Sequence, residues 1–558
     1  MKRSLAVLCT LLCCTLLSAQ IDKAAYEKEM EARRREYKTL RNEQREEYEA
    51  YRRQLNAEYA KHMRQAWTEY KPCPPKPVPL RPEPPKPVVK EPEVDTNPIV
   101  KPIPMVVPKV EPKEDPKEDP KEDPEVEPIV EPEDSIAEEP AEIPVTEPEV
   151  EPTEPMEEPE PEVEPAILPF DEVVPPTEPA PPVEPAVPLP MVEPVVPSAP
   201  GYEFDYYGTA CKVPLEASHR YALSGVGESA VADVWQVLSD EKYLPVLAQC
   251  ADYRTKLNLC DWGYVRFLQE MTESFFPSSQ HNEAVLMQAY LLVQSGYKVR
   301  MARTDDRLVL LLPIEHEVYN YSYLMVDGIP YYVIDRQKAG QSFYLYDRAF
   351  AKETSVSLYM PSPPSLQTVD SKSTKRMLTS RKQVEVTIET DKNLIDFYND
   401  YPVSAQWGYY SSASLSQDVK SALYPVLQQH IEGMSSADAA NLLLNFVQTA
   451  FDYKTDGEQF GSERPLFGDE TLYYPYCDCE DRSIFYSILV RDLLGLDVVL
   501  LNYPEHLATA VKFKEEVRGD YIQLDDGKYV VCDPTYIGAS IGMAMPDCRD
   551  EKAVIVRI

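Results

Sequence analysis

Three features are scarce or missing in this chain, and each absence excludes a class of protein. No apolar stretch beyond the first 19 residues reaches the roughly 20 residues that a membrane-spanning helix needs, so we expect no transmembrane segment in the mature chain. Basic residues are in deficit, with 56 Lys and Arg against 94 Asp and Glu and a formal net charge of −38. Such a chain repels phosphate, so we expect no nucleic-acid partner. Cys and His pairs with zinc-ligand spacing are also missing, and we expect neither a metal site nor a cofactor.

Residues 1–19 are typical of an export signal. Lys2 and Arg3 supply the positive end, residues 5–17 form an apolar run, and a small-residue cleavage site follows Ala19. The run is shorter than a membrane span, which favours a cleaved signal over a retained anchor. We therefore expect an exported, secreted protein in the periplasm or on the surface of a bacterium.

The cysteines give one pairing hypothesis. Of the 11 cysteines in the chain, eight lie beyond the signal. An exported protein can form disulfides, and Cys250 with Cys260 would make a short bridge. The remaining connectivity cannot be deduced from the sequence.

Residues 20–71 are expected to form one long charged helix, because they contain an internal repeat and neither Gly nor Pro. A period of eleven residues gives about 3.67 residues per turn, close to that of a straight helix, so the repeat draws one stripe along the helix. One interpretation is self-association through this stripe as a coiled coil; the other is a single helix held by Glu–Arg pairs on its surface. The stripe consists of Tyr26, Tyr37, Tyr48, Tyr59 and Tyr70, continued by Met30, Leu40, Tyr51, Leu55, Met63 and Ala66.

Residues 72–200 contain most of the 55 prolines and much of the acidic charge. Proline prevents helix and sheet formation, so we expect a disordered, extended spacer. Its composition resembles the Pro-Glu and Pro-Lys spacers of periplasm-spanning bacterial proteins. A passive tether and an acidic docking tail are both compatible with it.

Folded sequence of the α+β class is expected in a first module, residues 201–366, and a second module, residues 383–558, joined by a polar connector, residues 367–382. The predicted helices span residues 261–275, 282–295, 417–432, 437–451 and 479–494. The predicted strands span residues 298–302, 308–313, 321–326, 331–334, 384–388, 497–501, 507–513, 521–524 and 529–533.

The second module contains the elements of a thiol triad. Cys479 begins a predicted helix, His506 precedes an apolar strand, and Asp533 ends another strand. A thiol attacks carbonyl carbon only as a thiolate, which a helix N-terminus and an adjacent imidazolium both favour. The acidic neighbours of Cys479 oppose the thiolate, so His506 must compensate and Asp533 must orient its ring. Among these neighbours, Asp481 is expected to accept hydrogen bonds at the helix start and not to act in catalysis.

The motifs around these residues resemble the transglutaminase-like superfamily. They are the run Asp478-Cys479-Glu480-Asp481-Arg482-Ser483 at a helix start, a histidine heading a strand, and Asp533-Pro534-Thr535 after the next strand. The resemblance implies a papain-like fold with Cys479 as nucleophile, His506 as base and then acid, and Asp533 as the partner of His506. It also implies acyl transfer at amides, as cross-linking, peptide hydrolysis or removal of glycans from asparagine.

Two points of the resemblance concern the substrate side of the site. The family commonly has an aromatic residue just after its histidine, whereas Leu507 follows here. The backbone N–H of Cys479 is a candidate oxyanion donor, with Tyr473 or Tyr474 as candidates for a second donor. Neither point alters the triad.

We expect the two modules to repeat one plan. Placing Gly296 on Gly495 aligns helix, glycine, strand and hairpin. Gln280 then takes the position of Cys479, and Asp335 answers to Asp533. The histidine position is expected near Tyr319 or Tyr321, with His316 a few residues earlier. The first module would be a degenerate, inactive copy; chance similarity between two α+β segments is the alternative.

Two functions remain in view. The first is an exported thiol enzyme that acts on amide bonds of a protein or peptide substrate through an acyl-enzyme. The second is a non-catalytic scaffold that binds peptide or cell-wall material. Hydrolysis and cross-linking share the same acyl-enzyme and are not distinguished by these residues.

Overall fold

A computed structural model of the chain describes residues 28–33, 35–36, 39, 46–47, 49–79, 164–178, 183, 200–335, 342–346, 352–368 and 373–558. The chain divides into two compact units, of which one contains Met1–Glu91 and Pro165–Ile558 and the other is Pro92–Glu164. The expected signal and most of the expected spacer lie outside the described residues. Within the described part of the chain, no helix is both long and apolar enough to cross a membrane.

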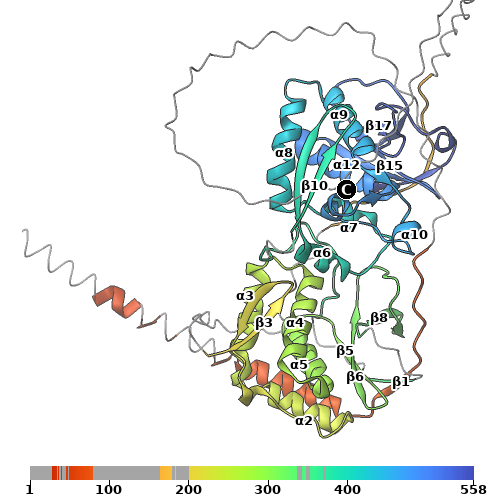
Figure 1. Ribbon diagram of the computed structural model, residues 1–558. Coiled ribbons are helices and arrows are strands. Elements are labelled where there is room, and N and C mark those ends of the chain that lie inside the picture. Colours follow the sequence, from red (N-terminus) through yellow and green to blue (C-terminus); the bar gives the residue numbers. More distant parts are fainter. Residues whose placement is uncertain are drawn as a thin grey trace, which may run out of the picture. The chain divides into compact units, whose positions relative to one another are not determined.

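The first module is an α+β fold in which helices pack on a six-stranded sheet (Figure 1). The sheet order is β1-β9-β5-β6-β8-β7, and every pairing is antiparallel. Helix α5 packs on β5 and β6, and α4 and α2 pack on α5. The helices are α2 (Glu228–Leu238), α3 (Leu244–Lys256), α4 (Asp261–Phe275) and α5 (His281–Gln294). The strands are β1 (Thr68–Tyr70), β5 (Arg300–Thr304), β6 (Arg307–Pro313), β7 (Tyr323–Val326), β8 (Ile329–Val333) and β9 (Phe343–Tyr346), with a separate hairpin of β3 (Tyr202–Tyr206) and β4 (Thr209–Val213).

The second module is also α+β, with a six-stranded sheet of order β16-β17-β15-β14-β18-β2. Helix α12 packs on β14 and β15, α9 packs on α12, and α8 packs on α9 and β11. The helices are α6 (Lys392–Asn399), α7 (Trp407–Ser412), α8 (Gln417–Ile431), α9 (Ser436–Thr449), α10 (Asp456–Gln459), α11 (Gly468–Tyr473) and α12 (Cys479–Leu494). The strands are β2 (Phe170–Val174), β10 (Ser373–Thr379), β11 (Glu385–Asp391), β12 (Asp452–Tyr453), β13 (Tyr476–Cys477), β14 (Asp497–Asn502), β15 (Leu507–Lys512), β16 (Tyr521–Leu524), β17 (Gly527–Cys532) and β18 (Ala553–Arg557).

The two sheets share one strand order, which supports the expected repeat of a single plan. Strands β7, β8, β6, β5 and β9 follow one another across the first sheet as β16, β17, β15, β14 and β18 do across the second. Each sheet then gains a sixth strand from a distant segment, β1 antiparallel to β9 and β2 parallel to β18. The long central helix of each module, α5 or α12, precedes these strands in the chain. Five strands of each module therefore lie in the same order and follow one another in the same sequence along the chain.

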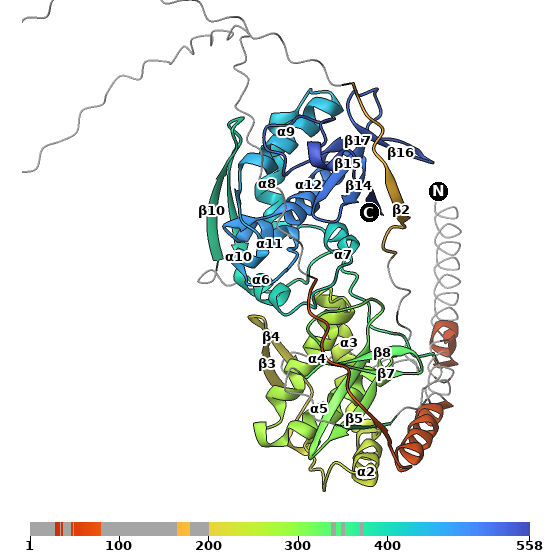
Figure 2. The same cartoon turned by 90° about the vertical axis from the view of Figure 1, so that its right-hand side faces the viewer.

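The N-terminal helix differs from the expectation. It ends at residue 63, and Thr68–Tyr70 is strand β1, because these residues find an edge partner in β9. Residues 49–63 pack against the first module of the same chain, so over this stretch the stripe is intramolecular (Figure 2). The predicted stripe is also rotated, because Tyr51 is 52% exposed. The buried positions are Glu49, Arg52, Asn56, Tyr59, Ala60 and Met63.

Three of these buried positions are polar, and the partners of two of them, Arg52 and Asn56, lie in the first module. Arg52 donates to the hydroxyl of Tyr290 at 3.1 Å. Asn56 exchanges hydrogen bonds with Gln294, at 3.2 and 3.0 Å, and accepts from Nε1 of Trp235 at 3.2 Å. A buried amide is tolerated when its hydrogen bonds are satisfied, which explains why the stripe is not wholly apolar.

The expected spacer is shorter than predicted at both ends. Cys73 bonds through its backbone N–H to Tyr323 O at 2.8 Å, so the first prolines lie on the first module. Residues 166–168 bond to Tyr521 of β16, and β2 adds to β18, so this segment joins both edge strands of the second sheet. Proline-flanked sequence can occupy a sheet edge because an edge strand leaves half of its N–H groups unpaired.

Two smaller expectations are also corrected. The predicted polar connector 367–382 contains β10, which pairs with β11 along its full length, because alternating residues of the hairpin pack against the module. The predicted bridge between Cys250 and Cys260 does not form, and all eight described cysteines are free thiols. Instead Cys250 contacts Met271 Sδ at 3.6 Å, and Cys260 caps α4 by accepting from Gly263 N–H at 3.4 Å.

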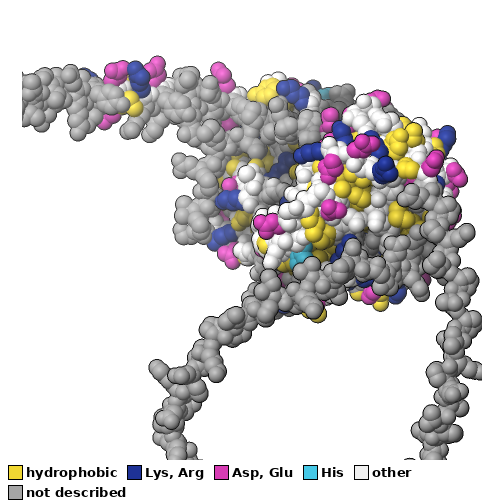
Figure 3. All heavy atoms as spheres, turned by 90° about the horizontal axis from the view of Figure 1, so that it is seen from above, with side chains coloured by type: hydrophobic (Ala, Val, Ile, Leu, Met, Phe, Trp, Pro, Cys, Tyr) yellow, Lys and Arg dark blue, Asp and Glu magenta, His cyan; other side chains and the backbone are white. Residues whose placement is uncertain are grey.

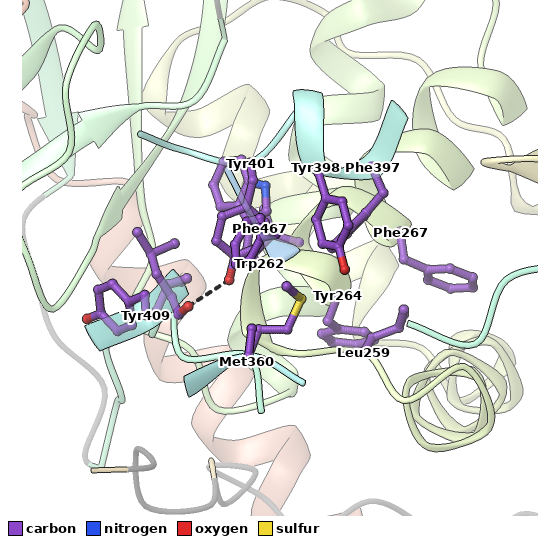
Figure 4. Packing of buried hydrophobic residues seen from close by; sticks show 14 of the residues in the cluster. Leu259, Trp262, Tyr264, Phe267, Met360, Phe397, Tyr398, Tyr401, Tyr409 and Phe467 are labelled. Atoms are coloured by element: carbon purple, nitrogen blue, oxygen red, sulfur yellow. Dashed lines mark hydrogen bonds between the residues drawn. The ribbon is translucent and has the colours of Figure 1, made fainter. Parts of the chain in front are cut away.

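Aromatic side chains join the cores of the two modules (Figure 4). Trp262 of α4 donates to the backbone O of Asp400 at 3.1 Å. The rings of Tyr398 and Phe467 stack at 4.6 Å, and Tyr401 meets Phe467 edge-on at 5.3 Å. Such ring pairs add to the energy of burial and fix relative orientation. Phe467 therefore anchors the chain just before α11, close in sequence to the predicted site.

Candidate functional site

Cys479 is the first residue of α12, as predicted. The helix begins at a capping box in which Asp478 and Asp481 bond to each other's backbone N–H, and it ends at Gly495 with φ 61°. Every residue from Cys479 to Val490 is buried, because α12 is covered by the sheet on one side and by other helices elsewhere. The Cys479 side chain is itself 1% exposed, and its Sγ donates to Glu480 Oε2 at 2.9 Å.

His506 and Asp533 form a buried pair. His506 Nε2 lies 2.9 Å from Asp533 Oδ2, and the two residues are 2% and 1% exposed. The other oxygen, Oδ1, accepts from the backbone N–H of Thr535 at 2.9 Å and of Tyr536 at 3.2 Å. These bonds hold the carboxylate in one orientation. The second ring nitrogen of His506, Nδ1, has no hydrogen-bond partner among the described residues.

Helix α12 and the sheet bring the three predicted residues to one end of the module. Ser483, one turn after Cys479, donates from Oγ to the backbone O of Leu507 at 2.7 Å, and Leu507 directly follows His506. Strands β15 and β17 pair antiparallel with Thr509 opposite Cys532, which places the start of β15 next to the end of β17. His506 and Asp533 are thus in direct contact. Helix α12, which Cys479 begins, contacts β15 through the bond from Ser483 to Leu507.

The carboxylates that flank the thiol tie a loop to the start of α12. Asp478 accepts from Asp456 N–H at 3.3 Å, and Asp481 accepts from Leu466 N–H at 2.9 Å and from Asp478 N–H at 3.3 Å. Asp456 accepts from Arg464 N–H at 2.6 Å. Asp481 is therefore a helix-start acceptor, as expected. We name residues 456–466 the cover loop, because they are bonded to the turn that carries the sealed thiol.

The same carboxyl groups form a cluster. Oxygens of Asp456, Asp478 and Glu480 lie within 4.8 Å of one another, a spacing at which carboxylates can hold a divalent cation. Protons on these carboxyl groups also reduce the repulsion between them. Burial, with the charges of Asp481 and Glu480, raises the pKa of Asp456 to about 10. Burial, with the charge of Glu480, also raises the pKa of Asp478 and of Asp481 well above the ordinary range.

Three residues around the triad were not predicted from the sequence. The Tyr453 hydroxyl has no hydrogen-bond partner among the described residues, and burial and the neighbouring Cys479 raise its pKa. Gln448 donates to the carbonyls of Asp533, Tyr536 and Ala539 at 3.1, 2.8 and 3.0 Å, so it fixes the turn after Asp533. Arg482 is fully buried and donates to Phe451 O at 2.9 Å. Only Gln448 left a sequence signal, a polar residue near the end of a predicted apolar helix.

The tyrosines expected to stabilise an oxyanion are directed elsewhere. The Tyr474 hydroxyl donates to Asn399 Oδ1 at 3.1 Å, and the Tyr473 ring packs edge-on against the Tyr474 ring at 5.0 Å. Tyr453 is the hydroxyl that faces the thiol.

The sheet registers identify the counterparts of the triad in the first module. Arg307 lies four residues before Leu311, which pairs with Val333, and His506 lies four residues before Ala510, which pairs with Val531. Asp335 lies two residues after Val333, and Asp533 lies two residues after Val531. The counterpart of His506 is therefore Arg307 and not Tyr319 or Tyr321, and the offset that places Gly296 on Gly495 also places His506 on Arg307.

The nucleophile position is also shifted from the expected Gln280. His281 is the first residue of α5, as Cys479 is of α12. His281 Nε2 and Arg307 Nη2 lie 3.3 and 3.1 Å from Asp335 Oδ2. The first module thus has a His–Arg–Asp cluster where the second has Cys–His–Asp. Comparison of the chain with models of known protein families, with curated proteins and with solved structures finds no match.

Proposed function

We propose that the second module is a transglutaminase-like thiol enzyme of papain-like fold that acts on amide bonds of protein or peptide substrates. The observation that carries the proposal is the buried His506–Asp533 pair next to a helix headed by Cys479. A carboxylate held at Nε2 leaves Nδ1 of His506 as the base, which is the nitrogen without a described partner. This division of roles is that of a thiol triad.

The reaction follows from these roles. His506 Nδ1 takes the thiol proton, and the sulfur of Cys479 bonds to the carbonyl carbon of the amide. When the C–N bond breaks, His506 returns the proton to the leaving amine, and a thioester remains. Water then yields an acid, or a second amine yields a new amide, and either restores the thiol. The backbone N–H of Cys479 and the Tyr453 hydroxyl are the candidate donors to the oxyanion.

A change of conformation must precede this chemistry. The thiol is 1% exposed and donates to Glu480, so substrate cannot reach it while the cover loop is bonded to Asp478 and Asp481. Release of the cover loop would open the site and let the thiol turn from Glu480 to His506. Closing loops that exclude water are common over reactive intermediates.

Selective alkylation of the thiol tests the proposal. Iodoacetamide at neutral pH should modify Cys479 faster than the buried Cys250 and Cys532, by roughly tenfold or more, because in the proposed triad His506 takes the proton from the Cys479 thiol. The rate should return to that of the other thiols in His506→Ala, and a control variant, His430→Ala on α8, should leave it unchanged. Equal labelling of all thiols in the unmodified chain would overturn the proposal.

A binding scaffold is the second candidate, and one observation favours it. The triad is sealed, whereas a cavity of about 790 Å³ opens beside the His–Arg–Asp cluster of the first module. Incubation with N-acetyl-glutaminyl peptides and a fluorescent primary amine separates the candidates. Ammonia release or amine incorporation that requires Cys479 supports the enzyme, and binding without turnover supports the scaffold. For either, we propose an exported location in the bacterial periplasm or at the cell surface.

A further inference from the structure

The His–Arg–Asp cluster of the first module lines an open cavity. The cavity has a volume of about 790 Å³ and lies between α4, the start of α5, the start of β6 and the end of β8, with Asp400 of the second module also on its wall. This volume is within the range of about 300–1,000 Å³ that is usual for ligand sites. His281, Arg307 and Asp335 are 28%, 35% and 18% exposed in their side chains, whereas the His506–Asp533 pair is sealed. The position that holds the triad in the second module is therefore accessible in the first.

The charges on the cavity wall are unequal. Four carboxylates face two guanidinium groups, which leaves an excess of two negative charges when His281 is neutral. Both arginines are already paired: Arg307 with Asp335 at 3.1 Å, and Arg266 with Asp400 at 3.2 Å. An anionic ligand would have to compete with these carboxylates for the same two arginines.

The negative excess comes from two exposed residues, Glu273 and Asp306. Glu273, on α4, accepts a hydrogen bond from the neutral amide of Gln269 at 2.9 Å. Asp306 lies in the turn between β5 and β6, where only its backbone O accepts a bond, from Asn282 at 2.9 Å. Neither carboxylate has a basic partner among the described residues. Both are available to a cation that enters the cavity.

Aromatic rings complete the wall. Trp262 and Phe276 are buried, and Tyr321 meets Trp262 edge-on at 6.5 Å. Aromatic faces attract cations and also pack against the methylene groups of a lysine or arginine side chain. An apolar stem with a positive head matches a cavity that is aromatic within and acidic at Glu273 and Asp306.

We propose that this cavity of the first module is a binding site for a basic side chain, lysine or arginine, of a polypeptide. The first module then keeps the location of the triad as a recognition site and has lost its nucleophile. The site does not depend on Cys479, so it can exist whether or not the second module is an enzyme.

Peptide binding to the full-length Cys479→Ala chain tests the proposal, because this background removes turnover. The probes are Ac-Ala-Ala-Lys-Ala-Ala-NH₂, the matched peptides with Gln or Glu in place of Lys, and free butylamine, each titrated by calorimetry. We expect the lysine peptide to bind at least about tenfold more tightly than the glutamine peptide and butylamine, and the glutamate peptide to bind least. Equal binding of the lysine and glutamate peptides would overturn the inference, and equal binding of butylamine would overturn its polypeptide part.

Variants and salt locate the site. Glu273→Gln together with Asp306→Asn should weaken binding of the lysine peptide by about five- to tenfold, and both residues are exposed, so the fold should persist. The matched control Glu432→Gln, an exposed acid after α8, should leave binding unchanged. Raising the salt concentration from about 0.05 to 0.5 M should weaken binding of the unmutated pocket and have less effect on the double variant. An unchanged affinity in the double variant would contradict the proposal.

Discussion

The two modules place different chemistry at the same point of the same sheet. In the second, His506 and Asp533 meet at 2.9 Å out of contact with solvent, whereas in the first, Arg307 and Asp335 meet at 3.1 Å in an open cavity. The five shared strands pack through residues along their lengths, while these side chains lie at the strand ends. Because strand ends contribute little to the core, they can change without loss of the fold.

The difference in exposure has a structural cause. In the first module α4 and α5 are separated by residues 276–280, whereas α9 and α12 are separated by residues 450–478. The longer connection contains the cover loop, which Asp478 and Asp481 hold against the start of α12. On the outer face drawn in Figure 3, Lys and Arg side chains lie among Asp and Glu, without a large area of one sign among the described atoms. The segment inserted between α9 and α12 therefore distinguishes the second module from the first.

The largest difference in reaction rate should come from changing Asp533 and Asp335, which occupy equivalent positions in the two modules. Asp533→Asn removes the charge that stabilises and orients the His506 ring, so amide acyl transfer should fall by about 10²–10⁴-fold. Asp335→Asn, the matched change in the first module, should leave the rate within about twofold, because it does not contact the triad. Steady-state kinetics on both variants checks the contrast. A similar loss of rate in the two variants would show that the two aspartates do not differ in function.

Two buried acids should differ in their effect on stability. Burial raises the pKa of Asp469 to about 6, and no base pairs with it among the described residues, whereas Asp261 is paired with Arg254 at 2.7 Å. The folded state of Asp469 binds its proton more tightly than the unfolded state, so its contribution to stability falls as the pH rises from about 4 to 6 and is constant above.

Urea unfolding at pH 4 and pH 8 measures this difference. The free energy of unfolding of Asp469→Asn, relative to that of the parent, should be about 2 kcal/mol higher at pH 8 than at pH 4. Asp261→Asn should instead lose about 2 kcal/mol at pH 8, because it leaves Arg254 without its carboxylate. The same pH dependence in both variants would contradict the assigned cause.

The N-terminal helix should stabilise the first module and not the second. Asn56→Ala removes the amide that satisfies Gln294 and Trp235, so unfolding of the first module should cost about 2 kcal/mol less. Tyr51→Ala, on the exposed face of the same helix, should change stability by less than about 0.5 kcal/mol. Hydrogen exchange resolved by segment measures both. Equal loss of protection in α12 and α5 would show that the helix does not act on one module alone.

The smallest effect should come from the contact between α12 and β15. Ser483 and Val285 are each the fifth residue of their helix, so Ser483→Val gives the second module the residue of the first. Loss of the bond to Leu507 O should cost about 1–2 kcal/mol and should slow alkylation of Cys479 by a few fold, because the helix start moves relative to His506. Ser483→Thr, which keeps a hydroxyl, should restore the rate. Urea denaturation measures the loss of stability, and alkylation kinetics under folding conditions measures the change at Cys479.

Local pattern was enough to predict the long central helices of both modules and the strands β5–β8 and β14–β17 beside them. The predicted helices at residues 261–275 and 479–494 and the strand at 521–524 agree with α4, α12 and β16 at both ends, because their caps and periodicity lie within the segment. The placement of Cys479 at a helix start and of Asp533 just after a strand followed from the same local signals. The predicted role of Asp481 was confirmed for the same reason, since its partners lie within one turn and one loop.

Long-range pairing decided the rest. Thr68–Tyr70 and Phe170–Val174 became strands only because β9 and β18 offered edges, and no local signal distinguishes these segments from the proline-rich chain beside them. The contacts of Asp335 with His281 and Arg307, and the bonds of Asp456 and Leu466 to the start of α12, join residues that lie apart in the sequence. The chain alone therefore determined where helices begin and which residue types could react. The tertiary structure decided which of those residues meet and which are exposed, because partners distant in sequence are chosen by packing and hydrogen bonding of the whole fold.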